Sequence, residues 1–400
     1  MTAENGFSGS VQVTLANLPS GITTNPASPF TATAGQSTTV IFGAAANATA
    51  GTFSVTAQGT SGVLSHSAGL SLSIQAVVSQ SLSRTAFVAN DSRTAVDSPG
   101  GEPRRRQIVY DAAGARFFIS NRAMNRVEVI PEVALTLQTT VDAPGASSAD
   151  LSADGSTLWV GSDTEYIFAV NAATLQVRAR YPFPALSPIP GVVFSRPTEL
   201  VPLASGKLLV RLRQPAGTEA LLALWDSSTN SVSDLTSRAP GVFQNGVGVL
   251  ARSGDRSRVL VGANDASGEL AVFDSTGNVV AGPLTVGGGT ISFAAGNPDG
   301  SRFAILFTSN GARSVLLFDG SLNPLGSYSS PGGVSVVFAR DGQRLFVSEV
   351  VGSANVVTAL SVSNLAPVGA VPDLGIPGSP SLLGDASGAS LLCGLGNHGL

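Results

Sequence analysis

Side chains able to act as nucleophiles, or as bases near neutral pH, are scarce in this chain. The 400 residues contain two histidines, His66 and His398, and one cysteine, Cys393. A serine or cysteine hydrolase needs a base within hydrogen-bond reach of its nucleophile, and we expect His66 on a strand and His398 in a loop. Cys393 falls in an apolar stretch and is predicted to be a small buried hydrophobe. A single cysteine also excludes an internal disulfide and a thiolate metal cage.

Carboxylates are the other candidates for chemistry. Asp163 and Glu165 stand two residues apart in one polar stretch, and such a pair can act in acid/base catalysis or bind a hard cation through oxygen ligands. Two carboxylates in one loop are also typical of a solvated surface. The glycines at 287–289 precede no helical pattern, so they do not predict a phosphate-binding loop. We therefore predict no catalytic residue, no metal site and no cofactor.

The composition narrows the classes of partner. Hydrophobic residues make up 43% of the chain and charged residues 12%, with a formal net charge of -4. The charged share is about half the usual ~25%, while the apolar share is that of a folded protein with a buried core. A small negative charge gives no reason to expect nucleic acid or an anionic membrane surface as a partner. No apolar run is long enough for a membrane-spanning helix.

The elements that must position any site begin with an uncharged segment. No Asp, Glu, Lys or Arg occurs between Glu4 and Arg84. Apolar and polar residues alternate in Val11-Gln-Val13-Thr-Leu15 and in Leu70-Ser-Leu72-Ser-Ile74, which is the pattern of half-buried antiparallel strands. Gly and Pro mark turns about every ten residues. We predict a small β-sandwich over residues 1–78, followed by a linker over 79–106 that includes a possible closing strand at 84–90.

From residue 107 onward, pairs of apolar strands are joined by short turns that contain glycine. The anchor glycines recur at intervals of 41 to 51 residues, at Gly114, Gly155, Gly206, Gly254, Gly300, Gly342 and Gly388. A period of 40 to 50 residues with four strands per unit is typical of a β-propeller. We predict an all-β chain with a seven-bladed propeller over 107–400. The last blade has only two strands within the sequence, and residues 84–90 are the best donor for closure.

Two resemblances agree with this interpretation. Residues 5 to about 76, with Asn5-Gly-Phe-Ser-Gly and Ala50-Gly-Thr-Phe-Ser-Val-Thr, resemble the immunoglobulin-like repeats of large bacterial surface and secreted proteins. The first strands of such a module are missing. Phe117-Phe-Ile-Ser-Asn121 followed by Arg126-Val-Glu-Val-Ile130 is similar to the YVTN family of seven-bladed propellers. Propellers host many chemistries, so the second resemblance indicates a fold and not an activity.

The YVTN resemblance implies where a ligand would bind. In that family the loops between the second and third strands of each blade lie on the face that usually binds ligands, and the anchor turns lie on the opposite face. A site of converging polar groups at the mouth of the channel is therefore predicted, although polar loop residues need no ligand to explain them. The candidate ligand-binding residues are Asn121, Arg122, Asp163, Glu165, Arg213, Asn264, Asp265, Asn310 and Glu349.

Two classes of function remain open. The first is a non-enzymatic binding or scaffold protein of the bacterial cell surface or exterior, with a small ligand, a glycan or a protein as its partner and no membrane span. The absent signal peptide is then expected to reflect a truncated chain. The second is a propeller enzyme similar to lactonases or lyases, using Asp163, Glu165, Arg213 and Glu349 at the central channel. A purely structural stalk segment is a third possibility.

Overall fold

The chain is all-β. The computed structural model describes residues 7, 9–45, 48–49, 51–74, 108–132, 137–215, 220–239, 246–263, 265–351, 354–371, 381–384 and 391–394. Two short 3-10 turns, η1 (Arg122–Met124) and η2 (Thr236–Arg238), are the only helical elements in those ranges. The chain divides into two compact units, 1–80 and 81–400, and each is described by itself. Residues 84–90, Gly388, Asn264 and His398, on which predictions above depend, lie outside the described residues.

The first unit consists of two small antiparallel sheets. One has the strand order β3-β1-β5-β6 and the other pairs β2 with β4. Their bounds are β1 (Ser10–Ala16), β2 (Ile22–Asn25), β3 (Phe30–Thr33), β4 (Ile41–Ala44), β5 (Gly51–Ser61) and β6 (Leu64–Ile74). The predicted alternation is confirmed in β1, where Val11 and Val13 are buried and their neighbours are exposed. Because few other side chains are buried, this unit has a thin core.

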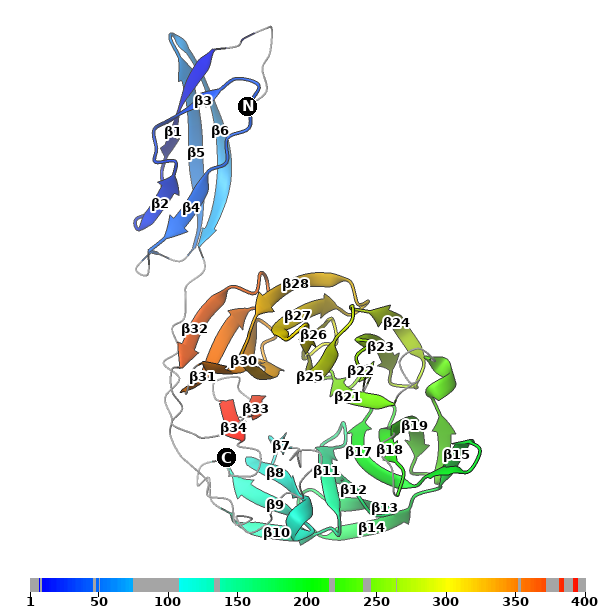
Figure 1. Cartoon of the computed structure of the whole chain (residues 1–400). Helices are drawn as coiled ribbons and strands as arrows, with labels where there is room; N and C mark the ends of the chain where they lie inside the picture. Colours follow the sequence, from blue (N-terminus) through cyan, green and yellow to red (C-terminus); the bar gives the residue numbers. More distant parts are fainter. Residues whose placement is uncertain are drawn as a thin grey trace. The chain divides into compact units, whose positions relative to one another are not determined.

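The described residues of the second unit form six four-stranded antiparallel sheets, which we number in chain order. They lie side by side around a ring, with the first strand of a sheet nearest the centre, as β11, β17 and β21 show (Figure 1). This architecture is consistent with a β-propeller. Sheet 1 comprises β7 (Ile108–Asp111), β8 (Arg116–Asn121), β9 (Arg126–Pro131) and β10 (Thr139–Asp142); sheet 2 comprises β11 (Ala146–Leu151), β12 (Thr157–Ser162), β13 (Tyr166–Asn171) and β14 (Val177–Pro182).

The remaining sheets follow the same order of pairing. Sheet 3 comprises β17 (Arg196–Pro202), β18 (Leu208–Arg213), β19 (Ala220–Asp226) and β20 (Ser231–Asp234); sheet 4 comprises β21 (Val247–Arg252), β22 (Arg258–Ala263), β23 (Glu269–Asp274) and β24 (Val279–Thr285). Sheet 5 comprises β25 (Thr290–Gly296), β26 (Arg302–Ser309), β27 (Ala312–Asp319) and β28 (Pro324–Ser329); sheet 6 comprises β29 (Gly333–Phe338), β30 (Arg344–Val351), β31 (Ala354–Ser361) and β32 (Pro367–Val371).

Two short strand pairs complete the described part of the second unit. β15 (Leu186–Ile189) pairs with β16 (Val192–Phe194) between sheets 2 and 3. β33 (Ser381–Gly384) pairs with β34 (Leu391–Gly394), and β33 lies beside the first strand of sheet 6. Cys393 lies within β34.

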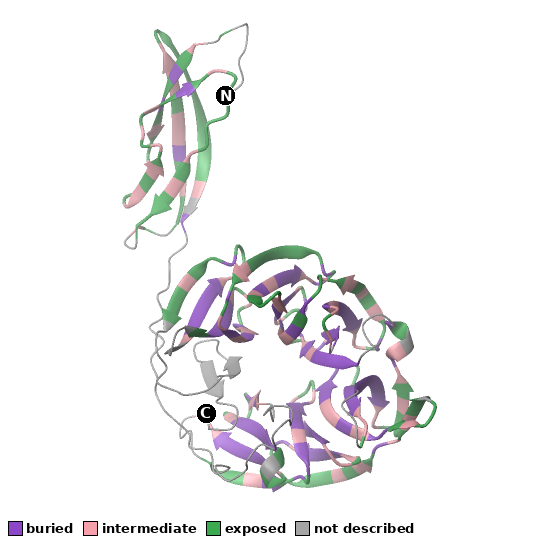
Figure 2. Ribbon diagram, viewed as in Figure 1, coloured by how far each residue is buried: buried purple, intermediate pink, exposed green. Residues whose placement is uncertain are grey.

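Burial shows what holds neighbouring sheets together. The inner and middle strands are largely buried and the outermost strands are largely exposed (Figure 2). The five largest apolar clusters are each shared between two consecutive sheets. Leu158 and Phe118 belong to a cluster of sheets 1 and 2, and Trp159 and Trp225 belong to the next one. The two tryptophan rings meet edge to face with centroids 5.7 Å apart, so both contribute to the core between sheets 2 and 3.

Turn chemistry explains why the chain reverses where it does. The Asp that ends the third strand stabilises the following turn: Asp226, Asp274 and Asp319 each accept a hydrogen bond from a backbone N–H two residues later. Such Asx turns leave the aspartate in the hairpin and not in a site.

Each four-stranded sheet of the second unit has an anchor glycine in its first hairpin, but this glycine is not always the residue with a positive φ. Gly155 has a φ of +70° in the turn of sheet 2. In the corresponding turn of sheet 4, Gly254 has no positive φ, and Arg256 takes the left-handed conformation with a φ of 62°. A residue with a Cβ is uncommon there, so Arg256 departs from the repeat.

Candidate functional site

Loops from three consecutive sheets converge on Asp163. We call the end of the ring that carries the connections between second and third strands the loop face, and the opposite end the turn face. Asp163 follows β12, and Arg122 of η1 in sheet 1 forms an ion pair with its Oδ2. Arg196, the first residue of β17 in sheet 3, lies with Nη1 3.9 Å from Oδ1 of Asp163. The structure therefore brings together two of the predicted residues and adds Arg196.

The backbone around this cluster is fixed by hydrogen bonds between loops. Asn125 takes a left-handed conformation after η1, and its Oδ1 accepts a bond from the N–H of Gly145 at 2.8 Å. The carbonyl of Gly145 accepts the N–H of Asp163 at 2.8 Å. Gly145 has a φ of +70°, and a Cβ there would lie 2.9 Å from Oγ of Ser162. The Asn125 side chain and the main chain of Gly145 thus tie the loops of sheets 1 and 2 together and place Arg122 opposite Asp163.

A second carboxylate belongs to the same part of the loop face. Ser195 donates its Oγ hydrogen to Oε1 of Glu165 at 3.1 Å. Arg213 is the register partner of Arg196 across β17 and β18, and its carbonyl accepts the N–H of Ser195 at 3.3 Å. The side chains of Arg122, Arg196 and Asp163 are 46%, 33% and 16% exposed. Solvent and solutes can therefore reach this group of charges, which we call the Asp163 cluster.

The other predicted residues lie elsewhere. Asn121 is buried, where its Nδ2 donates to Oε1 of Glu128 at 2.7 Å and its Oδ1 caps η1. Asp265 accepts the N–H of Ser267 in the loop of sheet 4. Asn310 is an exposed turn residue with a φ of 49° in the hairpin between β26 and β27. These positions are filled by turn and capping roles, which sequence alone does not separate from binding roles.

Glu349 sits in a pocket of hydroxyl groups in sheet 6 and is 5% exposed. It accepts hydrogen bonds from Ser330 Oγ at 2.5 Å, from Thr358 Oγ1 at 2.7 Å and from Tyr328 OH at 3.5 Å. Burial and the neighbouring charge of Glu349 raise the pKa of Tyr328. No hydrogen bond or ion pair of the described residues joins Glu349 to the Asp163 cluster, so the four residues considered above for catalysis do not form one constellation.

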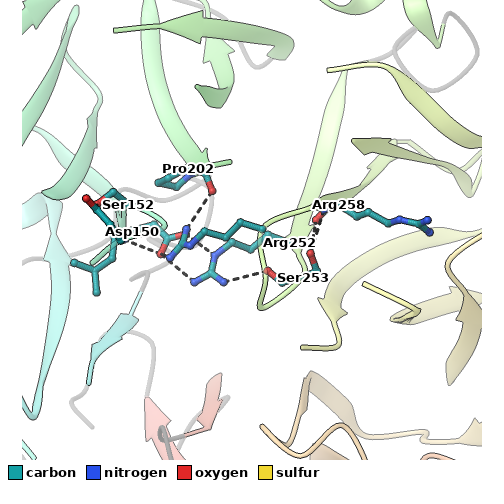
Figure 3. A network of polar contacts seen from close by, with 9 residues as sticks. Asp150, Ser152, Pro202, Arg252, Ser253 and Arg258 are labelled. Atoms are coloured by element: carbon teal, nitrogen blue, oxygen red, sulfur yellow. Dashed lines mark hydrogen bonds and ion pairs between the residues drawn. The ribbon is translucent and has the colours of Figure 1, made fainter. Parts of the chain in front are cut away.

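Sequence reasoning missed a buried ion cluster near the turn face, which Figure 3 shows from close by. Asp150 of β11 accepts two bonds from Arg252 of β21, Nε to Oδ2 at 2.6 Å and Nη2 to Oδ1 at 3.0 Å. Arg256 contacts the same two oxygens, each at 3.3 Å, and also donates to the carbonyl of Pro202 on β17 at 3.1 Å. We call Asp150, Arg252 and Arg256 the Asp150 cluster.

The charges in the Asp150 cluster determine its protonation states. Burial alone raises the pKa of Asp150, but the two arginine charges and their hydrogen bonds together outweigh it and lower the pKa. Burial and repulsion from Arg252 lower the pKa of Arg256 against the attraction of Asp150. The carboxylate is ionised and its oxygens also accept the N–H of Leu151 at 2.8 Å. A carboxylate so occupied is a poor general base.

Two positions at which the sequence departs from the repeat could have indicated this cluster. The position of Asp150 is apolar in the inner strands of sheets 3 to 6, where Val201, Ala251, Ala295 and Val337 correspond to it. Arg256 stands where sheets 2, 3, 5 and 6 have glycine with positive φ. Neither signal gives the partner, because Asp150 and Arg256 are 106 residues apart.

The residues that the structure describes contain no group of three or more His, Cys, Asp or Glu side chains that could hold a metal ion. Nor does any helix in the described ranges reach the length and apolarity required to cross a membrane. Models of known protein families gave no match to this chain, and a comparison with curated proteins gave no significant match.

Proposed function

We propose that this chain is a non-enzymatic binding or scaffold protein of the bacterial cell surface or exterior. In this proposal an immunoglobulin-like module precedes a seven-bladed propeller of the YVTN type, and the loop face of the propeller contacts a glycan, a small polar ligand or a protein. The sequence resemblances support this architecture. The six four-stranded sheets and the β33–β34 hairpin beside sheet 6 are compatible with it.

The Asp163 cluster is the observation that carries the proposal. Two guanidinium groups and a carboxylate from three different sheets meet at a solvent-accessible point. Exposed ion pairs contribute little to folding stability, with a typical value of about 0–1 kcal/mol, so the fold does not depend on this arrangement. Guanidinium and carboxylate groups held in fixed positions present directional donors and acceptors to a polar ligand.

An enzymatic role has weaker support. A lactonase or lyase needs its acid, base and electrophilic groups within reach of one substrate atom. Asp163 is engaged by two arginines, and Glu349 is enclosed by hydroxyl groups in another sheet. We therefore favour binding over turnover at the loop face.

The test uses the full chain and an array of neutral and acidic glycans. We expect at least one glycan to bind the wild type, and both Arg122→Ala and Asp163→Ala to weaken that binding at least about tenfold, which corresponds to one charge-assisted contact. Arg258→Ala is the matched control, because Arg258 lies at the turn face, where it donates to the carbonyl of Gly320. Equal binding by the loop-face variants and the wild type would refute the assignment of the site.

Turnover and location are tested separately. Hydrolysis of a lactone or ester by the wild type that is lost in Asp163→Ala would replace the binding proposal with an enzymatic one. Protease treatment of intact bacteria that express the natural gene should degrade the protein. Full protection in intact cells, together with degradation after lysis, would contradict the exterior location.

A further inference from the structure

We propose that the Asp150 cluster is an anion-binding site at the turn face, separate from the loop-face site, and that it takes a small oxyanion such as a sulfate, phosphate or carboxylate group. The cluster contains two guanidinium groups and one carboxylate, so it holds one uncompensated positive charge. Asp150 and Arg256 are buried, with side chains 4% and 10% exposed, whereas the side chain of Arg252 is 28% exposed. A solute can therefore approach through Arg252.

The hydrogen-bond count shows that donors remain. A guanidinium carries five N–H groups. Arg252 donates from Nε and Nη2 to Asp150 and from Nη1 to the carbonyl of Ser253. Arg256 donates from Nη1 to Asp150 and Pro202 and from Nη2 to Asp150. Within the described part of the chain, two N–H groups of each arginine are left without a protein acceptor.

Nearby carboxylates do not cancel the excess charge by direct pairing. Asp255, in the same turn as Arg256, accepts hydrogen bonds from the Ser253 hydroxyl and from the N–H of Ser257. No ion pair of the described residues joins Asp255 to either arginine of the cluster. Burial lowers the pKa of Arg256 against the attraction of Asp150.

The backbone of Arg256 is the second line of argument. Its left-handed conformation, with a φ of 62°, occurs at a position that is glycine in the turns of sheets 2, 3, 5 and 6. A residue with a Cβ is uncommon in this conformation, and such an outlier motivates a hypothesis of function. Pairing with Asp150 alone does not require Arg256, because Arg252 already binds both carboxylate oxygens. The second guanidinium supplies further N–H donors that an oxyanion can accept.

The site lies at the opposite end of the inner strands from the Asp163 cluster. β11 starts at Ala146, which pairs with Ser162 beside Asp163, and ends at Leu151, which follows Asp150. Loss of one site therefore leaves the loops of the other intact, so the two proposals can fail independently.

The experiment is calorimetric titration of the full chain with sodium sulfate, sodium phosphate and sodium acetate, each at constant ionic strength maintained with sodium chloride. We expect saturable binding of one oxyanion per chain and at least about tenfold weaker binding in Arg252→Gln, because a charge-assisted contact is lost. Arg258→Gln is the matched control and should bind like the wild type. The order of affinity among the three salts identifies the preferred oxyanion.

A second variant keeps the test decisive if Arg252→Gln folds poorly. Arg256→Gly restores the glycine of the other turns, and it should fold and bind sulfate at least about tenfold more weakly than the wild type. Asp150→Asn should bind sulfate at least about tenfold more tightly, since it removes the negative charge of Asp150 and leaves two positive charges. No saturable binding to wild type, or equal binding by wild type, Arg252→Gln and Arg256→Gly, would overturn the proposal.

Discussion

Replacing Asp150 with asparagine should destabilise the second unit strongly. The substitution keeps the size of the side chain but removes the negative charge that faces Arg252 and Arg256. Removing one partner of a buried ion pair typically costs about 3–5 kcal/mol, because the remaining charge is left buried without compensation. Arg252 is partly exposed and can recover some hydration, so we expect the lower end of that range, about 3 kcal/mol.

The assay is thermal unfolding followed by tryptophan fluorescence. The chain has two tryptophans, Trp159 and Trp225, and both pack in the cluster between sheets 2 and 3. Each kcal/mol shifts the Tm of a domain of 150–250 residues by about 2–4 °C, so a loss of about 3 kcal/mol in this larger unit should lower it by about 5 °C.

The control is Asp154→Asn, in the turn that follows the same strand. Hydrogen bonds from Ser152 and Ser156 lower the pKa of Asp154 to about 2, but this carboxylate is exposed and an asparagine oxygen can accept the same bonds. We expect a small change in Tm. The argument fails if Asp150→Asn costs less than about 1 kcal/mol, or if the control loses as much as Asp150→Asn does.

Three further predictions follow from single contacts. The folded-state pKa of Asp150 is lowered, so the stability that this carboxylate contributes is complete above the unfolded pKa of ~3.9 and is lost as pH falls through the folded pKa. The Tm difference between wild type and Asp150→Asn should therefore be constant above about pH 5 and shrink below about pH 4. Gly161→Ala should lower the free energy of unfolding by about 1–3 kcal/mol, since the new Cβ would lie 2.8 Å from the Pro197 carbonyl of the next sheet. Gly369→Ala should not lower it, because no heavy atom lies within 4 Å of a Cβ at that position. Asp163→Ala should change the free energy of unfolding by less than about 1 kcal/mol, because its ion pairs are solvent-accessible; a larger loss in urea unfolding would show that the Asp163 cluster supports the fold.

The sequence predicted local features of the fold well. The alternation of apolar residues and the glycine turns are both set by contacts within one hairpin. Four-stranded antiparallel sheets can therefore be predicted from the sequence of each repeat, and the structure contains them. Gly254 shows where this reasoning stops, because the repeat places a glycine in the turn while the left-handed residue is Arg256.

Contacts between sheets were not predictable in the same way. The inner strand of sheet 2 has an extra residue at Ser147, which donates its hydroxyl to the carbonyl of Thr198 at 2.6 Å. Thr198 is itself the extra residue of the inner strand of sheet 3. A bulge of this kind depends on how two sheets meet and has no fixed sequence pattern. The same holds for Asp150 and Arg252, which are 102 residues apart.

The two charged clusters have the same chemical composition, and burial separates their roles. Each has one aspartate facing two arginines from other sheets. Two unit charges 4 Å apart attract by about 1 kcal/mol in water and by about 4 kcal/mol at an effective dielectric constant of about 20. Contacts of the Asp163 cluster can therefore be exchanged for those of a ligand at little cost to the fold. Contacts of the buried Asp150 cluster cannot be exchanged in this way without a large cost to stability. An anion at the turn face must therefore bind to Arg252 and Arg256 while Asp150 stays in place.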